Sequence, residues 1–118
     1  MVVDLIDEQR ANELFHALAD ATRRDIVRRA MRGDHSVSAL AREYPMSFAA
    51  VQKHVAVLER AGLVNKQRQG REQLVQTDIE AIRKANQLLE ELEAIWTSRI
   101  DRIDEMLADP DEGETECP

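Results

Sequence analysis

The sequence has one cysteine, very few aromatic residues and no long apolar run. Its single cysteine, Cys117, can form no internal disulfide, which fits a protein of the reducing cytoplasm. Aromatic residues make up only 3% of the chain, so aliphatic side chains must build the core. No run of about 18 apolar residues exists, so we expect no membrane span. Residues 2–6 are too short and too acidic to form a signal peptide.

The chain also lacks the residue patterns that mark common catalytic sites. It has no glycine-rich phosphate-binding loop, no HExxH and no ordered Ser/His/Asp set. We therefore expect a protein that is not an enzyme and that carries no cofactor. At 118 residues, one domain over residues 1–108 is expected. Residues 109–118 are acidic and lack aliphatic side chains, which predicts a disordered tail.

The net charge of −7 is unevenly distributed along the chain. Residues 1–20 carry five acidic residues and one arginine, and residues 78–118 carry thirteen acidic and four basic residues. Between them, residues 21–77 carry eleven basic and five acidic residues, a net charge of +6. Salt screens charges over roughly 8 Å, so local sign matters more than the total. The central block is therefore compatible with nucleic-acid binding.

Four short helices are expected before residue 61. The first covers residues 7–19, and the second starts at Asp20 or Thr22, with Thr22 and Asp25 as an approximate capping box, and ends at Gly33. A third opens at Ser36 or Ser38 and ends at residues 44–45. Ser47 is a good N-cap for the fourth, over residues 48–60. The residues expected to point inward from the first three are Ala11, Leu14, Phe15, Leu18, Ile26, Val27, Ala30, Met31, Val37, Leu40 and Ala41.

A hairpin follows the fourth helix, after a stop at residues 61–62. Its expected strands are residues 64–68 and 71–76, with the turn at residues 69–70, and Leu74 is expected to point to the core. A helix, a glycine stop and a basic hairpin form the order that a winged helix-turn-helix requires. The predicted fold class is therefore mainly α, with about five helices and a two-stranded hairpin as the wing.

Residues 78–108 contain no glycine or proline and predict one long helix. Apolar residues recur along it at steps of three or four, and a small domain has no room to cover them all. We expect this helix to pair with a second copy of the chain, together with the first helix. The predicted dimer residues are Leu14, Leu18, Ile82, Leu89, Leu92, Trp96, Ile103 and Leu107.

Residues 11–77 resemble the ArsR-type winged helix-turn-helix repressors. The most specific runs are ALADATRR at residues 17–24 and KHVAVLERAGLV at residues 53–64. The resemblance implies a cytoplasmic, dimeric, DNA-binding transcription regulator that pairs through its first and last helices. Many thiol sensors of the family carry Cys-Val-Cys where this chain has Ser36, Val37 and Ser38, and other members bind metal on the last helix, which here has no histidine. The chain therefore resembles a metal-independent branch, and no metal site is predicted.

The fourth helix and the hairpin supply the candidate DNA contacts. Gln52 suits adenine, Lys53 suits guanine or phosphate, and wing cations bind phosphates or the minor groove. His54 has a structural alternative, and Phe48 can instead be a core residue. The predicted set is Ser47, Phe48, Ala49, Gln52, Lys53, His54, Lys66, Arg68 and Arg71.

These residues predict a homodimeric repressor that binds a near-palindromic, double-stranded operator. Two alternatives stay open: a metal- or ligand-responsive sensor of the same fold, and a winged-helix protein-interaction module. The sequence names neither the operator nor an effector.

Overall fold

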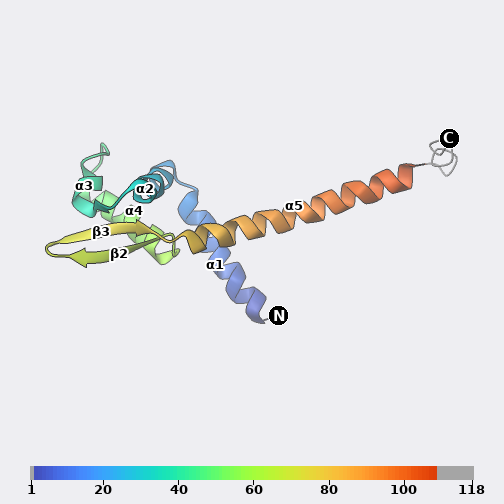
Figure 1. Ribbon diagram of the computed structural model, residues 1–118, viewed down its shortest axis with the longest axis horizontal. Helices are drawn as coiled ribbons and strands as arrows, with labels where there is room; N and C mark the ends of the chain where they lie inside the picture. Colours follow the sequence, from blue (N-terminus) through green and yellow to red (C-terminus); the bar gives the residue numbers. More distant parts are fainter. Residues whose placement is uncertain (1, 109–118) are drawn as a thin grey trace. The chain divides into compact units, whose positions relative to one another are not determined.

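The computed structural model describes residues 2–108, with side chains from residue 8 onward. Within this part the fold is mainly helical, as predicted, but its sheet has three strands rather than two. The chain divides into two compact units, Met1–Ala85 and Asn86–Pro118. The predicted tail and Cys117 lie outside the described residues. The elements, labelled in Figure 1, are α1 (Val2–Leu18), α2 (Ala21–Arg32), β1 (His35–Ser36), α3 (Val37–Ala41), α4 (Phe48–Arg60), β2 (Val64–Gln69), β3 (Glu72–Thr77) and α5 (Ile79–Leu107).

Aliphatic side chains build the core of the first unit, as the scarcity of aromatic residues requires. They come from all five helices and from β2 and β3, so each amphipathic element buries one face against the others. Leu14 is 5% exposed and belongs to this core. The largest fully buried side chains are Ile26, Leu40, Leu58, Leu63, Val51, Val55 and Val75.

Helix α2 begins at an aspartate cap. The Asp20 carboxylate accepts a hydrogen bond of 3.0 Å from the backbone N–H of Arg23, so Asp20 is the N-cap and the alternative start at Thr22 is wrong. Gly33 ends the helix as predicted. Ile26 is buried as expected, but Met31 is 49% exposed, so its predicted inward position is wrong.

The next two helices form the helix-turn-helix. The Ser36 hydroxyl accepts from the backbone N–H of Ala39 at 3.0 Å and caps α3, so Ser36 opens this helix and Ser38 does not. The helix ends at Ala41, a few residues before the predicted stop. Ser47 caps α4 by accepting from the backbone N–H of Ala50 at 3.1 Å, and α4 has the predicted bounds.

The wing is the antiparallel pair β2–β3, and β1 adds a short third strand on the other side of β3. The turn consists of Gly70, at φ 65°, and Arg71, one residue later than predicted. In this register Lys66 pairs with Val75, and Val75 is fully buried. Leu74 is only partly buried, so its predicted core position is wrong.

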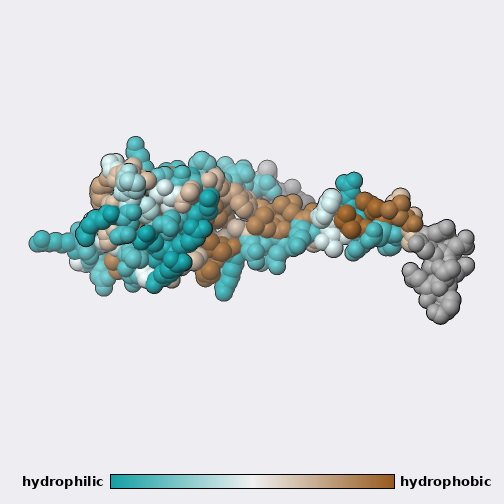
Figure 2. All heavy atoms as spheres, turned by 90° about the horizontal axis from the view of Figure 1, so that it is seen from above, coloured by the Kyte–Doolittle hydropathy of each residue, from teal (hydrophilic) through white to brown (hydrophobic). Residues whose placement is uncertain are grey.

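Helix α5 spans both units. Its first turns, through Ala85, belong to the first unit, where Ala81 and Ala85 are buried and Ile82 packs against the core. From Asn86 onward α5 forms the described part of the second unit. The brown surface in Figure 2 shows large hydrophobic areas along this helix. Among the described residues, no helix combines the length and apolar character that crossing a membrane requires.

Candidate nucleic-acid interface

Helix α4 presents one face to the core and the other to solvent. Val51, Val55 and Leu58 are buried at the three- and four-residue spacing of a helix face. The same periodicity places Ala49, Lys53 and Arg60 on the side farthest from the core, and all three side chains are exposed. The outer surface of α4 is therefore polar and basic, as a helix in a major groove requires.

Further predicted DNA contacts lie beside this outer surface of α4. Gln52 is exposed, and Phe48 is 46% exposed, so Phe48 is not a core residue. Ser47 is also exposed, although its hydroxyl is engaged as the helix cap. The prediction omitted Arg60, which lies seven residues after Lys53 and hence on the same face two turns later. That spacing is visible in the sequence and could have identified it.

The wing lies beside α4 and carries three basic residues (Figure 1). Lys66 and Arg68 are two residues apart on β2, so both point to the same face of the hairpin. Arg68 and Arg71 are exposed near the turn. Lys66 is less exposed, and its Nζ lies 3.5 Å from Oε1 of Glu59 on α4. Of the three predicted wing cations, Arg68 and Arg71 are thus the ones most open to phosphates.

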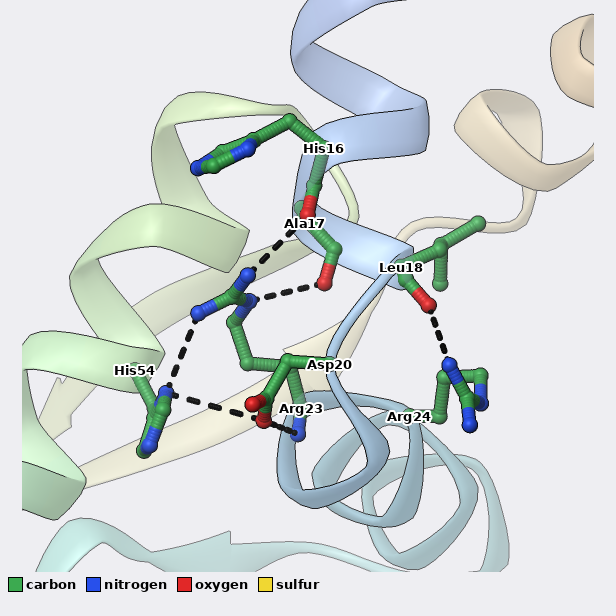
Figure 3. Close-up of polar contacts among 7 residues, drawn as sticks. All are labelled: His16, Ala17, Leu18, Asp20, Arg23, Arg24 and His54. Atoms are coloured by element: carbon green, nitrogen blue, oxygen red, sulfur yellow. Dashed lines mark hydrogen bonds and ion pairs between the residues drawn. The ribbon is translucent and has the colours of Figure 1, made fainter.

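His54 points away from the outer face of α4, toward the junction of α1 and α2 (Figure 3). Its Nδ1 lies 3.3 Å from Nη1 of Arg23 and 4.0 Å from Oδ2 of Asp20. The Arg23 guanidinium also donates to the backbone carbonyls of His16 at 3.0 Å and Ala17 at 2.8 Å. His54 therefore holds α4 against the preceding helices, which corresponds to its structural alternative and not to its place among the DNA contacts.

The side chains of Arg23 and Arg24 form hydrogen bonds with backbone carbonyls at the C-terminal end of α1. The last carbonyls of α1 have no partner inside the helix, and Arg23 takes two of them. Arg24 takes a third by donating to the Leu18 carbonyl at 2.7 Å. The backbone N–H of Arg23 lowers the pKa of the Asp20 carboxyl below its usual value. These contacts join α2 to the end of α1, and Arg23 also joins α2 to His54 of α4.

A second cluster holds the turn before α4. The Tyr44 hydroxyl donates to Oδ2 of Asp25 at 2.7 Å, and Nε of Arg29 donates to the same oxygen at 2.9 Å. Arg29 also reaches Glu43 at 3.2 Å and lies over the Tyr44 ring. Burial, with a smaller effect from Asp25, raises the pKa of Tyr44 to about 12. The bond from Tyr44, with that from Arg29, lowers the pKa of Asp25. The turn is thereby tied to α2.

No group of three or more potential metal ligands occurs among the described residues. Ser36, one of the two serines at the thiol-sensor positions, is 8% exposed and occupied as the cap of α3. Ser38 is exposed on α3. A capping hydroxyl is a poor ligand for soft metal ions, which prefer thiolates.

The residues predicted for dimerisation fall into two groups. Leu14 lies in the core of its own protomer, and Leu18 and Ile82 pack against that core, so Leu14 has little surface left for a partner. In the second unit the remaining predicted residues are exposed, and the prediction missed two exposed neighbours, Ile95 and Met106. The exposed apolar residues of this unit, here called the α5 stripe, are Leu89, Leu92, Ile95, Trp96, Ile103, Met106 and Leu107.

The fold, together with the exposed face of α4 and the basic wing, defines a winged helix-turn-helix DNA-binding protein. Residues 20–66 match the profile described as "Bacterial regulatory protein, arsR family". The chain is 39% identical over 83 residues to the HTH-type transcriptional regulator Rv2034 of Mycobacterium tuberculosis, a match covering 70% of this chain and 75% of that protein. The chain belongs to the ArsR family, and it is a DNA-binding transcriptional regulator rather than an enzyme.

Solved structures agree with this assignment. An ArsR-like transcriptional regulator from Rhodococcus sp. RHA1 is 32% identical, with a TM-score of 0.77 over 85% of this chain and 94% of that one. The homodimeric winged helix-turn-helix DNA-binding domain Mb0332 of Mycobacterium bovis has the same fold at 22% identity, with a TM-score of 0.61 over 77% of this chain and 83% of that one.

Proposed function

We propose that this chain is a cytoplasmic, homodimeric repressor that binds a near-palindromic operator. The observation that carries the proposal is the exposed polar and basic face of α4, with Lys53 and Arg60 beside a wing that exposes Arg68 and Arg71. Base edges would be read by α4 in the major groove, while the wing would contact the phosphate backbone. Bound in this way over a promoter, a dimer would block transcription.

The α5 stripe supports the homodimer. Seven large apolar side chains exposed on one helix form the kind of patch that marks an interface. The Mycobacterium bovis domain of the same fold is homodimeric. Two copies paired by a two-fold axis would present two α4 helices, and this symmetry matches the two halves of a palindrome.

Gel-shift titration against the DNA upstream of the protein's own gene tests the proposal. If three to five basic residues per protomer reach phosphates, the log–log salt slope should be on the order of −5 to −9 per dimer. In transcription assays on the same promoter, added protein should lower the amount of transcript. Binding with no salt dependence, or a rise in transcript, would contradict the proposal.

The dimer is tested separately with Leu92→Glu, which places a charge in the α5 stripe, where Leu92 is 55% exposed. Sedimentation should then show a monomer, and operator binding should fall although the DNA-facing side chains are unchanged. The control is Thr97→Glu, which adds the same charge to the same helix outside the stripe and should leave the dimer intact. A monomeric wild type at micromolar concentration would refute dimerisation.

A further inference from the structure

One acidic residue lies on the recognition helix α4. This residue, Glu59, is in the last turn, and its Oε1 lies 3.5 Å from Nζ of Lys66 on the wing strand β2. The side chains are 43% and 30% exposed, so solvent and DNA phosphates can reach the pair. Among the ion pairs of the described side chains, this is the one that joins α4 to the wing.

The backbone already holds α4 and the wing together without this ion pair. The N–H of Gly62 donates to the Glu59 carbonyl at 3.0 Å, and the N–H of Leu63 donates to the Leu58 carbonyl at 3.0 Å. Gly62 adopts φ 80°, which closes the connection, and both leucines are fully buried. Replacing Glu59 is therefore expected to leave the fold unchanged, so the role of the pair has to be sought in its charge.

The pair changes the electrostatics of the DNA-facing surface. Without Glu59, α4 and β2 would expose an uninterrupted set of cations that includes Lys53, Arg60 and Arg68. With it, Lys66 is paired with a carboxylate at 3.5 Å, so part of its positive charge is compensated on this surface.

We infer that Glu59 is a specificity-determining residue, which limits the affinity for non-specific DNA by holding Lys66 and repelling phosphates. This inference rests on the proposed DNA-binding face. Non-specific binding depends almost entirely on phosphate contacts, so it loses most when one cation is withheld. Operator binding also has base contacts, which fix the phosphates in one position and let Lys66 stay with Glu59. Discrimination between sequences depends on the difference between the affinities for the operator and for non-specific DNA, so it rises when non-specific binding is weakened.

Glu59→Gln tests the inference by fluorescence anisotropy on two duplexes, one from the upstream region and one with its sequence scrambled. Affinity for the scrambled duplex should rise at least about tenfold at low salt, and operator affinity should rise less than about threefold. One added phosphate contact per protomer should steepen the non-specific salt slope by about 2 per dimer. The control is Glu80→Gln, which removes the same charge from the Glu80–Arg83 pair on α5 and should leave both affinities unchanged.

The double variant Glu59→Gln/Lys66→Gln identifies the released cation. It removes both charges of the pair, so most of the gain in non-specific affinity should disappear. If Glu59→Gln matches Glu80→Gln, or if the double variant keeps the whole gain, the inference is wrong. A wild type that binds neither duplex would overturn the proposed function and this inference together, whereas salt-dependent wild-type binding with an inert Glu59→Gln would overturn this inference alone.

Discussion

Replacing Arg23 should reveal how much the junction of α1, α2 and α4 contributes to stability. Arg23→Met keeps a long, flexible side chain but removes the guanidinium that donates to the carbonyls of His16 and Ala17 and contacts His54. The two carbonyls belong to the last turn of α1, and the His16 carbonyl also accepts from the backbone N–H of Ala19 at 3.2 Å. His54 would also lose the contact that holds it on the inner side of α4.

The magnitude follows from the exposure of each contact. A hydrogen bond from a charged group contributes about 1.5–3 kcal/mol when it is shielded from water and less when it is exposed. Here the bond to Ala17 is part-buried and the bond to His16 is exposed, so the expected loss is about 2–3 kcal/mol in total. For a chain of 118 residues this corresponds to a fall in Tm of about 6–12 °C.

Arg24→Met is the matched control, because Arg24 makes one exposed bond to the end of the same helix. It should cost about 0.5 kcal/mol or less. Arg23→Lys should resemble Arg23→Met, since an ammonium group cannot reproduce the fork that spans two carbonyls. Thermal unfolding should be followed at one fixed protein concentration, because the midpoint of a dimer depends on concentration. Equal Tm values for Arg23→Met and Arg24→Met would refute this reasoning.

Two further predictions concern specificity and pH. Gln52→Ala should lose roughly 1–3 kcal/mol of operator-binding free energy per base contact and relax the sequence preference. Arg68→Ala should instead weaken binding to all sequences more evenly. If both variants keep the affinity and sequence preference of the wild type, the proposed DNA-binding face is wrong. Because the pKa of Asp25 is lowered in the folded state, its stabilisation is present above a pH of about 4 and is lost as pH falls through the folded pKa. Because the pKa of Tyr44 is raised to about 12, its stabilisation is present below a pH of about 10 and is lost between about 10 and 12. In urea unfolding, Tyr44→Phe should therefore have a free energy of unfolding about 1 kcal/mol lower than the wild type at neutral pH, and this difference should shrink toward pH 12. A difference that does not change with pH would contradict the role given to the Tyr44 hydroxyl.

The sequence by itself determined the recognition helix. Ser47 supplies a cap, Val51 and Leu58 mark the buried face, and Gly62 supplies the positive φ that ends the segment. All of these signals act within a few residues, so local chemistry was sufficient to predict the bounds of α4. The exposure of Arg60 followed from the same period, and a stricter application of it would have included that residue.

Tertiary structure decided the features that depend on contacts between distant residues. The hairpin turn was predicted one residue early, and Leu74 was assigned to the core although the neighbouring Val75 is the buried residue, because two adjacent apolar residues in a strand do not show which of them faces the core. Leu14 was expected at a dimer interface, and the packing of the other helices placed it in the protomer core. In both cases an apolar side chain is recognisable from the sequence, but its partner is not.

The polar contacts show most clearly which features the sequence determines and which depend on tertiary packing. Arg23 and His54 are 31 residues apart, and Asp25 and Tyr44 are 19 apart. Each of these residues, taken singly, is compatible with a solvated surface position. The sequence determined which charges and hydrogen-bonding groups exist, and only the packing of α1, α2 and α4 decided which of them meet, because a side-chain hydrogen bond forms only within about 3.5 Å.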